Sequence, residues 1–184
     1  VPGGLDAAAM NQHISRITSR FLPVGGVIYA FLESENRLNP LTRCLVLASA
    51  YFNKQDAQRH RDAYQCDEAL LAQGLHSSLI FADLASLSVE VITDGYSYPI
   101  DIDFHKAIAY GRRAVELAPA SSQAHRSLAR ALQAAGETEP SLDMIREAHA
   151  LNPYDLGIAA SYGNTLIATG DFETAVTVLE RTIE

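Results

Sequence analysis

Apolar residues recur at intervals of three and four along most of the chain. One face of a helix is formed in this way by Met10, Ile14, Ile17 and Phe21. The stretch Ile80–Ile92 is apolar enough to form a helix inside a core. Because no stretch alternates apolar and polar residues as a half-buried strand does, the pattern predicts an all-α protein.

A period of 34 residues runs through the second half of the chain. It separates Ala114 from Ala148, Leu117 from Leu151, Pro119 from Pro153 and Gly136 from Gly170. A helix–turn–helix unit of this length is the tetratricopeptide repeat (TPR) period. On these residues the chain resembles TPR proteins, most clearly over Ile80–Glu184. The resemblance implies a right-handed solenoid of antiparallel helix pairs, and the alternative is an unrelated helical bundle with the same spacing.

Helix-end signals place the individual helices. Asn39 followed by Pro40 is a cap before a first helical proline, and Asp155 has the position of a second cap. Gly170 is a C-terminal stop, and Gly163 occupies a slot where two helices approach closely. The sequence thus predicts about four TPR-like helix pairs from residue 41 to the end, with an inserted loop near residues 93–103.

Residues 1–40 do not follow the repeat. The break at Pro23–Gly26 separates two short predicted helices. We expect either a capping pair that covers the first repeat or a linker that docks an upstream domain or a second protomer. The absence of an initial Met and the open helical pattern at Glu184 indicate a piece of a longer protein. On the last helix we expect exposed apolar side chains, such as Val176 and Leu179, which would favour a homodimer.

The composition argues against some classes of function. The 184 residues carry 14 Lys and Arg against 22 Asp and Glu, a formal charge of −8, and 48% are hydrophobic. An acidic chain is a poor binder of phosphate backbones, so we expect no direct nucleic-acid binding. No apolar run reaches the roughly 18 residues of a membrane helix, which favours a protein without a membrane segment, and we place it in the cytoplasm.

The sequence offers few candidates for catalytic or metal-binding residues. The six histidines show no metal-ligand spacing, and His125 is predicted to be a packed repeat residue. Cys44 and Cys66 are interpreted as small buried residues, with a redox pair as the alternative. No nucleophile motif, phosphate loop or metal set is present, so we expect no enzyme activity, no cofactor and no metal.

The inserted loop carries acidic and aromatic residues. Asp94, Asp101 and Asp103 lack the ligand order of a calcium loop, so a solvated loop is the preferred interpretation. Its two tyrosines, Tyr96 and Tyr98, are candidate contacts for a partner.

A binding groove is the strongest candidate site. In TPR arrays the first helix of each pair lines a concave face, which here predicts groove positions at Gln123, Arg126, Arg130, Gln133 and Asn164. Arg126 and Arg130 are four residues apart, so both side chains project from one helix face. Two guanidinium groups and an amide suit a carboxylate or an acidic peptide. The set resembles the carboxylate clamp of chaperone-binding TPR domains, with Arg in place of its Lys and Asn pattern; a merely solvated polar face is the alternative.

The order of segments is similar to the C-terminal regions of bacterial multidomain regulators. The residues that carry this resemblance are the broken linker FLPVGGVIYA, the degenerate helix LTRCLVLASAYF and the repeats GRRAVELAP and AHALNP. Such proteins join a TPR array to a winged-helix or adenylate cyclase domain, often through a TolB-like segment. The resemblance implies a protein-interaction and sensory module for signal transduction or transcription regulation. The alternative is a non-catalytic fragment of an adenylate cyclase, and an enzyme or a DNA-binding segment fits the residues less well.

Overall fold

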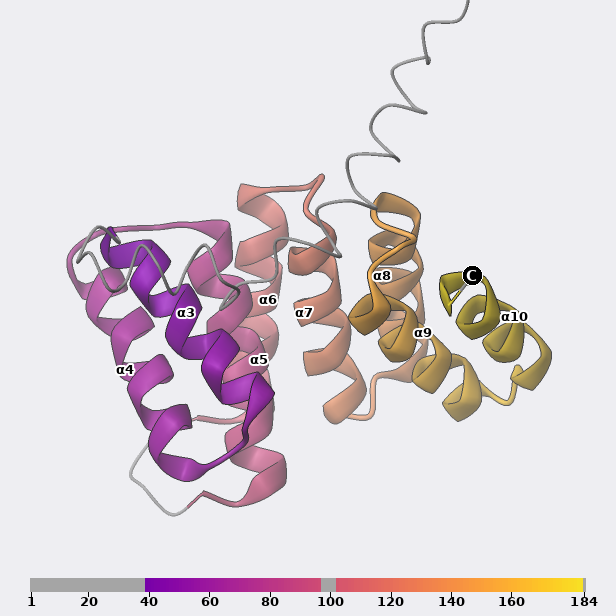
Figure 1. The fold of residues 1–184 in the computed structure, drawn as a ribbon, viewed down its shortest axis with the longest axis horizontal. Coiled ribbons are helices and arrows are strands. Elements are labelled where there is room, and N and C mark those ends of the chain that lie inside the picture. Colours follow the sequence, from indigo (N-terminus) through magenta and orange to yellow (C-terminus); the bar gives the residue numbers. More distant parts are fainter. Residues whose placement is uncertain (1–38, 97–101, 184) are drawn as a thin grey trace, which may run out of the picture.

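The computed structural model describes residues 39–96 and 102–183, and within them it contains eight α-helices and no β-strand (Figure 1). The helices are α3 (Pro40–Asn53), α4 (Ala57–Ala72), α5 (Ser78–Asp94), α6 (Phe104–Leu117), α7 (Ser122–Ala134), α8 (Thr138–Leu151), α9 (Leu156–Thr169) and α10 (Phe172–Ile183). The all-α prediction is therefore confirmed for the described part of the chain. The predicted helices of residues 1–38, with the stripe that begins at Met10, lie outside it.

The helix ends follow the capping residues that the sequence singles out. The Asn39 side chain accepts a hydrogen bond from the Thr42 backbone N–H at 2.8 Å, and Pro40 is the first helical residue of α3. Asp155 caps α9 in the same way, accepting from Ile158 N–H at 2.9 Å. Gly170 ends α9 with a φ of 85°, a left-handed conformation that favours glycine.

The helices stack as successive pairs, α3 with α4, α5 with α6, α7 with α8 and α9 with α10 (Figure 1). The odd-numbered helices also contact one another along the array, from α3 to α5, α7 and α9. The odd-numbered helices are consequently the ones that share a common face, as the first helices of TPR pairs do.

The central helix α5 is almost completely enclosed. Its residues 80–91 are all buried, because α3, α4, α6 and α7 pack around it. The hydroxyl of Ser78 donates to the Ala114 carbonyl at 2.8 Å, which ties α5 to α6. An equivalent bond from Ser141 to the Ala129 carbonyl, also 2.8 Å, ties α8 to α7. The apolar helix that the sequence predicts here is thus the core of the fold.

Cys44 and Cys66 form a disulfide that joins α3 to α4. The preferred interpretation of two separate buried thiols is corrected by this pairing. The physical reason is the antiparallel arrangement of the two helices, which brings the Cα atoms of residues 22 positions apart to 5.4 Å from each other. The disulfide fixes α3 to the body of the array.

Candidate functional site

A cavity of about 780 Å³ lies on the face shared by the four odd-numbered helices. This volume is within the range of small-molecule and peptide sites. Its lining includes Leu45, Ala48, Phe52 and neighbouring residues of α3; Leu79, Asp83, Ser86 and Glu90 of α5; Gln123, Arg126 and Arg130 of α7; and Gly157, Ala160, Ser161 and Asn164 of α9. We call this cavity the groove.

The groove contains four of the five positions that the repeat period predicts. Gln123, Arg126 and Arg130 line it from α7, and Asn164 lines it from α9. Gln133 is not among the lining residues; it is half-buried near the end of α7, where its carbonyl accepts from Gly136 N–H. Four of the predicted positions, on α7 and α9, therefore line one cavity, and Gln133 lies outside it.

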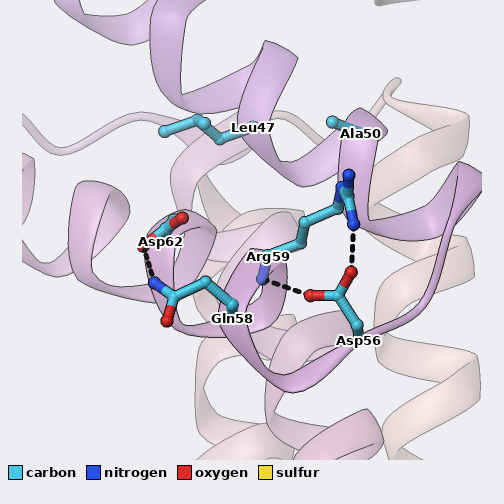
Figure 2. A pocket seen from close by; sticks show the side chains of 6 residues that line it. All are labelled: Leu47, Ala50, Asp56, Gln58, Arg59 and Asp62. Atoms are coloured by element: carbon cyan, nitrogen blue, oxygen red, sulfur yellow. Dashed lines mark hydrogen bonds and ion pairs between the residues drawn. The ribbon is translucent and has the colours of Figure 1, made fainter.

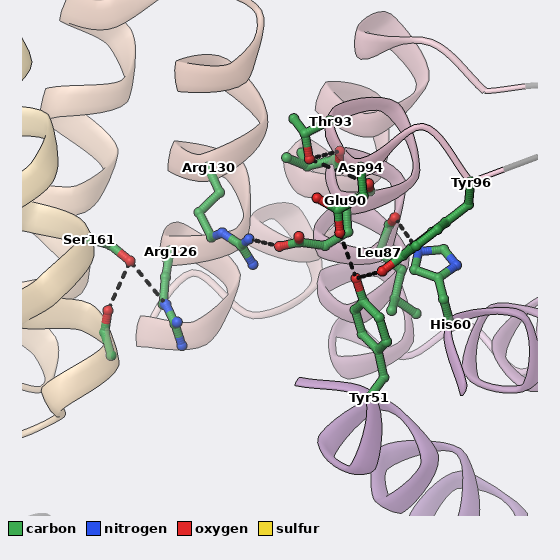
Figure 3. A network of polar contacts seen from close by, with 12 residues as sticks. Tyr51, His60, Leu87, Glu90, Thr93, Asp94, Tyr96, Arg126, Arg130 and Ser161 are labelled. Atoms are coloured by element: carbon green, nitrogen blue, oxygen red, sulfur yellow. Dashed lines mark hydrogen bonds and ion pairs between the residues drawn. The ribbon is translucent and has the colours of Figure 1, made fainter. Parts of the chain in front are cut away.

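Arg130 is not free for a ligand, contrary to the prediction that both arginines are available in the groove. Its guanidinium donates to a carboxylate oxygen of Glu90 on α5, forming an ion pair with side-chain exposures of 24% and 10% (Figure 3). The same guanidinium lies 5.8 Å from the centre of the Phe52 ring. Because the buried Glu90 carboxylate needs a counter-charge, Arg130 is occupied within the protein.

Arg126 is held differently. Its Nε donates to the Ser161 hydroxyl at 3.4 Å, its one side-chain hydrogen bond within residues 39–96 and 102–183 (Figure 3). The guanidinium lies flat against Gly157, where an added Cβ would stand 3.0 Å from both terminal nitrogens. Burial, and next the charge of Arg130, lowers the pKa of Arg126 from its usual value, although a guanidinium stays protonated in proteins. Arg126 therefore has terminal N–H donors left for an anion.

Sequence reasoning missed the acidic wall of the groove. Leu79, Asp83, Ser86 and Glu90 are spaced by four, three and four residues, so they share one face of α5. The available signal is the spacing of polar residues inside an otherwise apolar helix. Asp83 is only 9% exposed, and its Oδ2 is buried with no hydrogen-bond partner among the described residues.

A second carboxyl group lies deeper, on α4. Asp67 is fully buried, and both of its oxygens lack a hydrogen-bond partner in the described part of the chain. Burial raises the pKa of Asp67 to about 8, and the charge of Asp83 adds to the shift. Burial also raises the pKa of Asp83 to about 7. The groove is thus backed by two carboxyl groups that hold protons far more readily than exposed ones.

A smaller cavity of about 410 Å³ lies between α3 and the start of α4 (Figure 2). Its polar side chains already bind one another. Asp56 pairs with Arg59 and accepts its backbone N–H, which lowers the pKa of Asp56, and Gln58 donates to Asp62 at 2.7 Å. With these groups satisfied, the pocket offers less to a ligand than the groove does.

Tyr96, expected to be an exposed loop contact, packs inward. Its hydroxyl lies 3.2 Å from that of Tyr51, which also donates to Asp94 at 3.5 Å (Figure 3). Its ring lies beside His60, whose Nε2 is 2.6 Å from the Leu87 carbonyl oxygen. Tyr96 is therefore half-buried, in contact with Tyr51 of α3 and His60 of α4. Tyr98 and Asp101 lie outside the described residues.

His125 is a packed residue, as the repeat predicts. It is 7% exposed, and its Nε2 lies 2.9 Å from the Pro119 carbonyl oxygen. Across residues 39–96 and 102–183, no group of three or more His, Cys, Asp or Glu side chains is gathered to hold a metal ion. In the same residues, no helix has the length and apolar character needed to cross a membrane.

No protein-family model matches the chain, and no curated protein matches it in sequence. Its fold is similar to solved structures of MamA. MamA 41-end from Desulfovibrio magneticus RS-1 has a TM-score of 0.56 at 16% identity, over 98% of this chain and 96% of that one. A further structure of MamA has a TM-score of 0.54 at 15% identity, over 98% and 95%. The likeness shows that the chain folds as an all-α, TPR-like solenoid.

Proposed function

We propose that the protein is a non-catalytic interaction module whose groove binds an extended segment of a partner protein. The observation that carries the proposal is Arg126, a half-buried guanidinium that lines the groove with terminal N–H groups not used by the described residues. A carboxylate of the partner would take those donors in a charge-assisted, two-point contact. Asn164 and Gln123 supply further amide donors and acceptors along the same groove.

Peptide selection tests this proposal. A random 12-residue display library is panned on the immobilised protein, and enriched peptides are titrated by fluorescence anisotropy. We expect Arg126→Gln to weaken them by about 10-fold or more, as the loss of a partly shielded charge-assisted bond predicts. Ala160→Trp, which fills the groove from α9, should abolish binding.

The matched control is Arg146→Gln on α8, whose side chain is 56% exposed and pairs with Asp143. It should bind the selected peptides as the wild type does. Failure to enrich any peptide, or peptides that bind equally well to the Ala160→Trp variant, would contradict the groove as a binding site.

Self-association is a second candidate, favoured by one observation. Apolar side chains are exposed on the last helix pair, at Leu156 (65%), Ile167 (48%), Phe172 (62%) and Val176 (54%). Leu179, also expected to be exposed, instead packs on Gly163, where an added Cβ would meet it at 3.2 Å. The four exposed side chains suit a second copy of the chain, which would cover some of them in a homodimer.

The wider setting of the module is also a proposal. The resemblance of its segment order to multidomain regulators supports a role in signal transduction or transcription regulation, with a cyclase parent as the alternative. The gene sequence before the Val1 codon tests this: a winged-helix, cyclase or TolB-like segment there would support it, and another domain type would contradict it. The cytoplasmic location stays a prediction, and the Cys44–Cys66 disulfide is an observation against it, because disulfides persist mainly in oxidising compartments.

A further inference from the structure

The charges that line the groove are not equally available. Four charged side chains line it within the described residues: Asp83, Glu90, Arg126 and Arg130. Glu90 and Arg130 form an ion pair with each other. The two that remain open to a ligand are therefore one carboxyl group, on α5, and one guanidinium, on α7.

Asp83 is an unusual carboxyl group to leave without a partner. It lines the groove, is 9% exposed, and has a buried Oδ2 that no described residue bonds. A buried polar atom without a partner costs folding free energy, so native proteins keep few of them. A cationic donor in the groove would give this carboxyl group a charged partner that no described residue supplies.

The surroundings of Asp83 select the kind of donor. Leu79 lies one turn before it on the same face of α5, and Leu45 and Phe52 line the groove from α3. Long basic side chains place their methylene stems along such apolar walls while the charged group reaches a carboxylate. Ser86, one turn after Asp83 on α5, adds a hydroxyl to the same wall.

We infer that Asp83 receives the ammonium or guanidinium group of a Lys or Arg side chain on the segment that the groove binds. The inference rests on the proposed function and specifies the charges of the segment that the groove binds. The bound segment carries a basic side chain for Asp83 and an acidic one for Arg126. A segment whose charged side chains are all acidic would place a negative charge against Asp83.

Asp67 supports this division of roles. Burial raises the pKa of both carboxyl groups, and the charge of Asp83 adds to the shift of Asp67. Of the two, only Asp83 lines the groove, so a cationic group bound there would favour the ionised form of Asp83. Glu90 on α5 is neutralised by Arg130 on α7, which leaves Arg126 as the remaining charged lining group on the facing helix.

Parallel selections test the inference. The 12-residue display library is panned on the wild type, on Asp83→Asn and on Arg126→Gln. Peptides enriched on the wild type should contain both a basic and an acidic residue. The Asp83→Asn selection should lose the preference for Lys and Arg and keep that for Asp and Glu, and the Arg126→Gln selection should show the reverse.

A pairwise comparison measures the contact itself. In the best wild-type peptide, replacing its Lys or Arg by Gln should weaken binding to the wild type by about 10- to 100-fold. The same replacement should change binding to Asp83→Asn by less than about twofold, because the carboxylate that it contacted is gone. Asp143→Asn, an exposed carboxyl on α8, is the matched control and should behave as the wild type.

The possible failures are distinguishable. The role of Asp83 alone would be overturned if the selected peptides depended on Arg126 but showed no preference for basic residues. It would also be overturned if replacing the basic residue of the peptide by Gln weakened binding equally to the wild type and to Asp83→Asn. No enrichment on the wild type would overturn the groove as well. Should Asp83→Asn fail to unfold cooperatively in urea, Asp83→Ser takes its place, and the peptide series on the wild type still decides whether a basic residue is required.

Discussion

Gly111 on α6 lies so close to Leu128 on α7 that an added Cβ would stand 2.8 Å from the Leu128 Cα. Backbone atoms cannot yield as the end of a flexible side chain can. We expect Gly111→Ala to destabilise the protein by about 1–3 kcal/mol through overpacking, even after the better helix propensity of Ala. Urea unfolding followed by circular dichroism measures the change.

Gly163→Ala is the matched comparison. There the nearest atoms belong to the flexible Leu179 side chain, at 3.2 Å, so the cost of crowding and the gain in helix propensity should nearly cancel. A loss at Gly111 that is no larger than the small change expected at Gly163 would show that α6 and α7 can separate at little cost.

Gly157 controls the position of Arg126. A Cβ there would stand 3.0 Å from the terminal nitrogens of Arg126 and would push the guanidinium along the groove. We expect Gly157→Ala to weaken a groove-selected peptide by roughly 3- to 10-fold, about 1 kcal/mol, with the unfolding midpoint nearly unchanged. Gly163→Ala, at a position of the same helix that faces α10, should leave the peptide affinity unaltered. A Gly157→Ala variant with wild-type affinity would argue against Arg126 as the anchor.

Local signals in the sequence predicted much of this architecture. The caps at Asn39 and Asp155 and the stop at Gly170 depend only on residues within a few positions of each helix end, so they are visible without a structure. The 34-residue period placed Arg126 and Asn164 on one face because it holds for the last two helix pairs.

The acidic wall of the groove, on α5, could not be predicted from local signals or from the period. Glu90 pairs with Arg130 across 40 residues, and the helix that carries Glu90 belongs to a pair that departs from the repeat. No period relates Asp83 to Arg126, so only the packing of α5 against α7 shows that they line one groove. The Cys44–Cys66 pair stayed only an alternative interpretation for a similar reason, since its geometry depends on how α3 and α4 cross.

Reduction of the disulfide should loosen one wall of the groove. Cys44 lies on α3 next to the lining residue Leu45, and the bond ties α3 to α4. Loss of a cross-link of this loop length costs about 3 kcal/mol, so reductant should lower the urea midpoint of the wild type. The double variant Cys44→Ala/Cys66→Ala should have that lower midpoint with or without reductant. The prediction would be contradicted if the urea midpoint of the wild type stayed the same in reductant while a thiol assay showed that the disulfide had been reduced.

The exposed apolar side chains of the last helix pair should drive self-association. We expect the sedimentation coefficient of the wild type to rise with concentration, and Val176→Glu to hold the protein as a monomer, because a charge in an apolar contact is costly to bury. Ala150→Glu, at an exposed position on α8, is the control and should associate as the wild type does. A wild type that sediments as a monomer at all concentrations would leave these side chains without a role in dimerisation.

Asp67 should make the fold less stable as the pH rises. The pKa of its carboxyl is raised from 3.8 to about 8 by burial and then by Asp83, so the folded state holds a proton that the unfolded state releases. Stability from this group is therefore fully present below about pH 4 and is lost progressively as the pH rises to about 8. Asp67→Asn, which keeps the shape without the charge, should match the wild type at pH 4 and exceed it by several kcal/mol at pH 9, since each unit of pKa shift corresponds to about 1.4 kcal/mol. Urea midpoints across that range measure the difference, with the exposed Asp143→Asn as a control that should give no such trend. An Asp67→Asn curve parallel to that of the wild type would mean that the Asp67 carboxyl gains a partner when it ionises.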